Sequence, residues 1–140
     1  MDASRKKLVT TGLKFSVPDP FGNTVALYAN TWDVHILEGH KEMEKLLRAV
    51  ENTVRNPGFA YRSSISDISL IFHGHNLLTP DPKILRAVIK YPGILNVDEV
   101  VGGTFSGIVT TALVLRPENE FTGNIGPEFY RRPSKGKKKK

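Results

Sequence analysis

The sequence predicts an α+β domain in which amino-terminal helices pack on an antiparallel β-sheet, followed by a flexible basic tail. Apolar residues recur at helical spacing between residues 43 and 54, and several later segments alternate or are rich in β-branched residues. Seven of the last ten residues are basic, and 140 residues suit one domain. We therefore expect a flexible arm over residues 1–11, a single domain over 12–117, and an extended, basic, disordered tail over 118–140.

The first half of the chain contains the predicted helices. Short extended segments are expected at residues 14–17 and 24–29, where apolar and polar side chains alternate. A short helix is expected over residues 31–38 and ends at Gly39. The apolar residues between 43 and 54 then predict one amphipathic helix, which the Asn-Pro-Gly sequence at residues 56–58 terminates. Its apolar face needs a sheet to pack against.

The second half supplies that sheet. Residues 66–73 alternate between apolar and polar, and residues 84–91 form a further strand candidate. Residues 97–101 form a short extended candidate, and residues 104–115 are the longest β-branched stretch, which favours a central strand. After Pro117 the chain is rich in glycine, proline and charge, so little regular structure is expected there.

The net charge of +6 comes from the carboxyl terminus. Residues 131–140 hold seven of the 20 basic side chains, so the remaining residues carry 13 basic and 14 acidic side chains. A basic tail attracts nucleic-acid phosphate without sequence preference. It can equally act as a solubilising end, and the charge alone does not decide between these roles.

Several function classes are excluded by composition. The chain has no cysteine, which excludes disulfides, thiolate metal sites and a cysteine nucleophile. This is compatible with a reducing compartment, and we expect a cytoplasmic location. No apolar run is long enough to cross a bilayer, and residues 1–11 lack the apolar core of a secretory signal, so no membrane association is expected.

Two histidines flank the first predicted helix. Trp32 and His35 are three residues apart and so share a helix face, and His40 directly follows Gly39. Histidine exchanges protons near neutral pH, which makes His35 and His40 candidates for general acid–base chemistry. The alternative is structural, with His35 filling a gap in the core and His40 capping a helix.

His73 and His75 form a second pair at the end of a predicted strand. Their spacing places both imidazoles on one side of the strand, as some metal sites require. No carboxylate or third histidine lies close in sequence, so a role facing the surface or a nucleic acid is favoured. We predict no metal ion and no cofactor.

Cations and hydroxyls on the predicted strands are candidates for binding phosphate. Arg86 and Lys90 share one face of a strand, where they could hold phosphate or remain solvated. Thr110 and Thr111 lie in the last long strand, and one of their hydroxyls must face opposite to the other. Arg55, at the end of the amphipathic helix, could reach the sheet.

Four segments carry a family resemblance. The run from Trp32 to Met43, together with residues 53–57, 89–91 and 109–112, resembles the phage and polymorphic-toxin branch of the barnase/EndoU/colicin/RelE-type nuclease superfamily. Members show a tryptophan and a histidine, then a His-Pro-Glu start to an amphipathic helix that ends near Asn-Pro. Strands with a Val-Lys and a Val-Thr-Ala segment follow.

The resemblance implies a barnase/RelE-like fold and metal-independent cleavage of RNA. A base takes the proton of the 2′-hydroxyl, which attacks the neighbouring phosphate, and an acid protonates the leaving oxygen. RNA is the implied partner, and an antitoxin or immunity protein is a possible second one. The residues at the matching positions are the proposed catalytic His35, His40 and Lys90 and the phosphate-binding Arg55, Thr110 and Thr111, to which Arg86 is added from its place on the strand.

The chain departs from the family pattern at several positions. Lys41 replaces the usual proline, Glu38 and Gly39 replace basic residues, and Leu113 replaces a common aromatic. These changes leave open a non-catalytic module of the same fold that binds nucleic acid or protein. A metal-dependent hydrolase that uses His73, His75 and another histidine is the third hypothesis.

Overall fold

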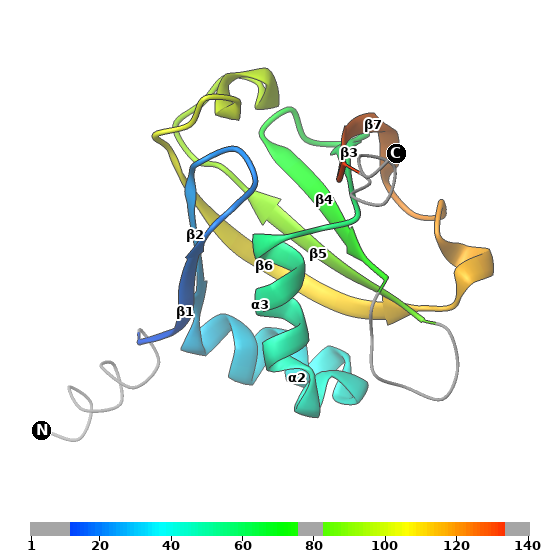
Figure 1. The fold of residues 1–140 in the computed structure, drawn as a ribbon. Helices are drawn as coiled ribbons and strands as arrows, with labels where there is room; N and C mark the ends of the chain where they lie inside the picture. The colour runs from blue at the N-terminus through cyan, green and yellow to red at the C-terminus, as the bar shows by residue number, and fades with distance from the viewer. Residues whose placement is uncertain (1–11, 76–82, 134–140) are drawn as a thin grey trace, which may run out of the picture.

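The computed structural model describes residues 12–75 and 83–133. These residues fold around a seven-stranded, mostly antiparallel sheet with the strand order β1-β2-β6-β5-β4-β3-β7 (Figure 1). The predicted α+β class and antiparallel sheet are confirmed. The strands are β1 (Leu13–Pro18), β2 (Thr24–Tyr28), β3 (Phe59–Ser63), β4 (Ser69–Gly74), β5 (Ile84–Lys90), β6 (Ser106–Leu115) and β7 (Ile125–Arg131).

The longest strand, β6, lies inside the sheet, as its β-branched sequence predicts. It pairs antiparallel with β5 and parallel with β2. The other neighbouring strands run antiparallel. The register between β5 and β6 shifts at Val88 and Ile89, which places Thr110 in an irregular step of the ladder.

Short helical segments cover one face of the sheet. They are η1 (Thr31–Ile36), α2 (Leu37–Gly39), η2 (Lys41–Lys45) and α3 (Leu47–Arg55). Trp32, Ile36, Met43, Val50 and Val54 from this layer belong to the same buried cluster as the sheet residues Leu85, Ala87 and Ile89. Alternate residues of β5, such as Arg86 and Lys90, therefore lie on the opposite face, which we call the open face.

The predicted helix through residues 43–54 is broken at Leu46. Its first part is the 3₁₀ segment η2, and α3 begins at Leu47 after Leu46 adopts φ −111° and ψ 17°. The amide of Leu46 donates to the carbonyl of Met43, three residues back, which tightens the chain at this point. Apolar spacing identifies the buried face but does not distinguish this tighter winding from an α-helix.

The extended segment expected at residues 97–101 is instead a 3₁₀ turn, η3 (Val97–Val100). The Asn96 side chain accepts a hydrogen bond from the Asp98 amide at 2.9 Å. The Glu99 carboxylate in return accepts from the Asn96 amide at 3.2 Å. This reciprocal capping box satisfies the free amides at the start of the turn and outweighs the extended preference of the valines.

The structure also differs from the expected disordered tail over residues 118–140. After the short turn η4 (Pro117–Asn119), β7 extends the sheet by pairing with β3. Phe129 and Tyr130 pack against the core, and both contact the ring of Phe21. Gly126 and Pro127 obscure the strand pattern in the sequence. Residues 134–140 and the expected arm over 1–11 lie outside the described residues.

The described segments, 12–75 and 83–133, include no helix that is long and apolar enough to cross a membrane.

The buried Asp19 carboxylate connects the turn between β1 and β2 to distant parts of the chain. Asp19 Oδ1 accepts from the amides of Phe21 and Asn23, and its Oδ2 accepts from the Tyr91 hydroxyl at 2.7 Å. Asn23 bonds onward to the carbonyl of Val100 and the amide of Phe105. Burial and the neighbouring Asp19 charge raise the pKa of Tyr91, so this phenol stays protonated as a donor. The turn is thereby held to three distant segments.

We expect Tyr91→Phe to lower the free energy of unfolding by about 1–3 kcal/mol, because the buried Asp19 carboxylate loses a charged hydrogen bond. Tyr28→Phe serves as the control, since Tyr28 is exposed, and its effect should stay within about 0.5 kcal/mol. Urea unfolding followed by circular dichroism measures both. Equal stabilities of the two variants would contradict the role given to the Asp19–Tyr91 bond.

Candidate functional site

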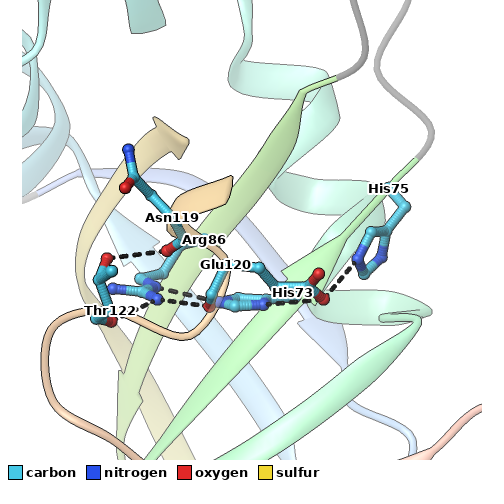
Figure 2. A network of polar contacts seen from close by, with 6 residues as sticks. All are labelled: His73, His75, Arg86, Asn119, Glu120 and Thr122. Carbon is cyan, nitrogen blue, oxygen red and sulfur yellow. Dashed lines mark hydrogen bonds and ion pairs between the residues drawn. The ribbon is translucent and has the colours of Figure 1, made fainter. Parts of the chain in front are cut away.

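The open face carries a buried polar network at the centre of the sheet. His73 on β4 and Arg86 on β5 are opposite each other in the strand register, and both side chains are buried. The chain that leaves β6 crosses over them on its way to β7, between residues 116 and 124. In Figure 2, Arg86, His73, Glu120 and His75 follow one another in a row, with the Glu120 carboxylate between the two imidazoles.

Arg86 fixes the connection between β6 and β7. Its Nη2 donates to the carbonyls of Glu120 at 3.1 Å and Thr122 at 3.0 Å, and its Nε donates to His73 Nε2 at 3.0 Å. Burial lowers the pKa of Arg86 from its ordinary value. The guanidinium predicted to bind phosphate is therefore used inside the protein, where it anchors the backbone on both sides of residue 121.

His73 is held neutral. Burial, followed by the positive charge of Arg86, lowers its pKa to about 3. Since Nε2 accepts the bond from Arg86, the ring proton belongs on Nδ1. That buried Nδ1 has no hydrogen-bond partner in the described part of the chain and lies 3.9 Å from Glu120 Oε2. A neutral imidazole makes no ion pair, so the contact with Glu120 is a weaker dipolar one.

His75 is the accessible member of the network. Its Nε2 lies 3.0 Å from Glu120 Oε2, and its side chain is 32% exposed. The carboxylate accepts a hydrogen bond from Nε2–H, which leaves Nδ1 as the unprotonated nitrogen of the neutral ring. A Cβ placed on Gly58 would lie 3.0 Å from this Nδ1, so the glycine leaves the nitrogen uncovered. The arrangement is a carboxylate-oriented imidazole of the kind that transfers protons.

His75 borders a groove of about 650 Å³ between α3 and the adjoining ends of β3 and β4. We call this cavity the basic groove. None of its described lining residues is a carboxylate, and four are lysine or arginine. The lining consists of Lys45, Leu46, Arg48, Ala49, Asn52, Thr53, Arg55, Asn56, Gly58, Gly74, His75 and Arg132.

The basic groove follows from the spacing of polar residues along the helical layer. Residues 48, 52 and 55 are three or four positions apart on α3, so their side chains share the face opposite to Val50 and Val54, and Lys45 at the end of η2 joins them in the lining of the groove. Arg55 is paired with Glu51 at 3.3 Å. Lys45 and Arg48 have no ion-pair partner among residues 12–75 and 83–133. The groove therefore keeps a net positive charge that suits an anionic ligand.

The glycine that ends β4 allows α3 to lie close to the sheet. A Cβ on Gly74 would lie 2.3 Å from Thr53 Oγ1, a distance that real Cβ atoms do not show. Thr53 is buried at this contact. The absence of a side chain at residue 74 thus sets the distance between the helix that carries the cations and the strand that leads to His75.

The residues predicted from the sequence do not meet in one place. His35 lies exposed on η1, and His40 lies between α2 and η2 with its Nδ1 3.7 Å from Glu42 Oε2. Both belong to the helical layer and neither lines the basic groove. Lys90 is exposed on the open face, so the sheet separates it from the helical layer that carries the two histidines.

The two threonines of β6 have separate roles. Thr110 Oγ1 donates to the carbonyl of Val88 at 3.3 Å, within the irregular step of the ladder. Thr111 pairs with Val88 on the open face and is half-buried. Of the predicted phosphate-binding residues, Arg55 alone lines the basic groove.

The sequence interpretation singled out His75 but not its partners. Glu120 was assigned to the disordered tail, and no role was predicted for Arg48 or Asn52 of the amphipathic helix. The three- and four-residue spacing of cations along that helix was the available signal. His73 and His75 also do not converge with a third ligand: the described segments contain no group of three histidines or carboxylates placed to hold a metal ion.

Comparisons with known proteins add no assignment: no family model, curated protein or solved structure matches the chain.

The neutral His73 predicts a specific dependence of stability on pH. The unfolded chain takes up a proton at this residue below about pH 6.5, whereas the folded protein does so only near pH 3. The effect of His73 on the free energy of unfolding is therefore most favourable to the folded protein above pH 6.5. As the pH falls from 6.5 towards 3, this free energy decreases by about 1.4 kcal/mol per pH unit.

His73→Gln tests this dependence, because the amide oxygen can accept the Arg86 bond but does not titrate. We expect the unfolding free energy of the parent to fall more steeply than that of the variant between pH 6 and pH 4. Urea unfolding at several pH values gives both slopes. Identical slopes would show that His73 titrates alike in the folded and unfolded chains.

Proposed function

We propose that the protein is an endoribonuclease that cleaves RNA by attack of the 2′-hydroxyl, with the basic groove as its phosphate site and His75 as its proton-transfer group. The observation that carries this proposal is the position of a carboxylate-oriented imidazole at the edge of a cationic groove. Phosphodiester cleavage by this route needs a proton acceptor beside the reacting hydroxyl and positive charge around the phosphate. It needs no cofactor.

The reaction divides between two sets of side chains. In the proposed step, unprotonated His75 Nδ1 takes the proton of the 2′-hydroxyl as the 2′-oxygen forms a bond to phosphorus. The bond from phosphorus to the 5′-oxygen breaks, and this leaving oxygen is protonated from solvent at the open groove. Lys45, Arg48 and Arg55 stabilise the charge that develops on the phosphate. The products are a 2′,3′-cyclic phosphate and a 5′-hydroxyl.

The family resemblance supports RNA as the substrate class. The segments from Trp32 to Met43 and around Asn56 and Pro57 resemble those of nuclease toxins, and a barnase/RelE-like version of the α+β fold is part of this proposal. In the proposed site, however, the proton-transfer role belongs to His75 and not to His35 or His40, because His75 is the one of these three histidines that lines the groove. Arg55 keeps its predicted role at phosphate, and Arg86 becomes a positioning residue.

Cleavage of single-stranded RNA in the presence of a chelator tests the assignment. We expect His75→Gln to lower kcat/KM by about 10²- to 10⁴-fold, which is the usual contribution of a general acid or base. His35→Gln and His40→Gln are matched controls outside the groove, and each should retain the parental rate. The same oligonucleotide with deoxyribose should not be cleaved, since it lacks the attacking hydroxyl.

The controls also identify the alternatives. Loss of activity in His35→Gln or His40→Gln, with His75→Gln unaffected, would show that the catalytic histidine lies in the helical layer. A parent protein that binds RNA without cleaving it would be the non-catalytic binding module. To separate groove binding from the basic tail, the lysines at 135 and 137–140 are replaced with glutamine in a further full-length control.

The uncovered Nδ1 of His75 predicts an effect of Gly58→Ala. The added methyl lies 3.0 Å from Nδ1, so the ring must shift by a few tenths of an ångström. We expect a several-fold fall in kcat, because catalytic efficiency depends steeply on the position of the reacting groups. Gly39→Ala is the control, because a Cβ there meets nothing within 4 Å.

Steady-state cleavage and urea unfolding of both glycine variants separate catalysis from stability. Parental kcat in a correctly folded Gly58→Ala variant would argue against Nδ1 as the reacting nitrogen.

A further inference from the structure

A row of aromatic rings extends from His75 across the open face. The centroids of His75 and Phe59 are 5.8 Å apart, those of Phe59 and Tyr61 are 6.0 Å apart, and those of Tyr61 and Phe121 are 5.9 Å apart. Each ring therefore contacts the next, and the row connects the proposed proton-transfer group with the chain that crosses the sheet. We call these four residues the aromatic row.

Phe121 ends the aromatic row, and most of its side chain is exposed. Its side chain is 66% exposed, whereas Tyr61 beside it is only 5% exposed. The two rings meet edge to face at 87°, so Tyr61 covers only part of Phe121. Packing inside the protein explains the positions of Phe59 and Tyr61, but it leaves most of the Phe121 ring in water at a cost in free energy.

The backbone that carries Phe121 is fixed on both sides. The carbonyls of Glu120 and Thr122 both accept from Arg86 Nη2, and the Thr122 hydroxyl donates to the carbonyl of Asn119 at 2.8 Å (Figure 2). The same Glu120 orients His75 through its carboxylate. A single turn thus holds both the exposed ring and the proposed proton-transfer group, which fixes their separation before any ligand binds.

We infer that Phe121 is a stacking platform for an unpaired nucleobase of the same strand whose phosphate is held in the basic groove. This inference rests on the proposed function and specifies its substrate as single-stranded RNA. The aromatic row joins a flat apolar ring to a cationic groove, which suits the bases and phosphates of one nucleotide chain, and bases stack on aromatic side chains largely irrespective of sequence.

An unpaired base is required because the faces of paired bases are already stacked on their neighbours. RNA-binding proteins accordingly place aromatic rings against the splayed bases of single strands and loops. Double-stranded RNA can still meet the basic groove through its phosphates. The platform therefore predicts discrimination between the two forms of the same sequence.

Binding of a non-cleavable, 2′-deoxy-substituted single strand, followed by fluorescence anisotropy, tests the platform apart from catalysis. We expect Phe121→Ala to raise the Kd by about 5- to 100-fold, the range measured for loss of one stacked base. Phe121→Trp should stay within about 2-fold of the parent, and Phe121→Leu should behave like the alanine variant, since stacking needs an aromatic face. Ile65→Ala removes an equally exposed apolar side chain outside the aromatic row and should leave the Kd unchanged.

Two further arms complete the design. For a duplex of the same sequence, Phe121→Ala should change the Kd by less than 2-fold, and an abasic nucleotide in the single strand should abolish the difference between parent and variant. Equal losses on single strand and duplex, or no loss on either, would overturn the inference. If parental binding follows these patterns but no RNA is cleaved, the proposed endoribonuclease activity fails and the platform stands. If the parent binds no RNA, both fail.

Discussion

The Arg86 guanidinium is a cation buried in the middle of the sheet, and most of the open face is arranged around it. A buried charge needs fixed acceptors, and these come from His73 Nε2 and from the carbonyls of Glu120 and Thr122. Because His73 Nε2 accepts a hydrogen bond from this cation, the imidazole must be neutral. The bonds to the two carbonyls fix the chain between β6 and β7, which has no regular secondary structure beyond the turn η4 to hold it.

The candidate site depends on this anchor. Because the connection is fixed at Glu120, one carboxylate oxygen of this residue reaches His75 Nε2. The imidazole borders the basic groove, and its Nδ1 stays uncovered because Gly58 has no side chain. The opposite wall of the groove comes from α3, whose approach to β4 is set by Gly74. Two glycines and one buried arginine thus bring cations from the helical layer to a histidine on the sheet. The proposed chemistry and the stacking of a base both use this one arrangement.

Local signals predicted the regular parts of the fold well. The β-branched residues of 104–115 identified the interior strand β6, and the apolar positions at Val50 and Val54 identified the face of α3 that packs on the sheet. Local reasoning was wrong where a distant partner decides the structure. Residues 125–131 become a strand because β3 offers an unpaired edge. At residues 97–100 the reason is local: the Asn96 side chain accepts from the Asp98 amide and the Glu99 carboxylate accepts from the Asn96 amide, which outweighs the extended preference of the valines.

By itself, the sequence determined which apolar face of the amphipathic segment is buried, where most strands run, and that charged groups lie on the other face of that segment, because alternation and helical spacing are local properties. Only the tertiary structure decided that Arg86 is internal, that His35 and His40 lie apart from Lys90, and that Glu120 meets His75, which lies 45 positions earlier in the chain. The physical reason is that a side chain's chemical role depends on the partners around it. Those partners come from segments that are distant in the sequence and cross in the folded chain, and such contacts leave no periodic pattern in the sequence.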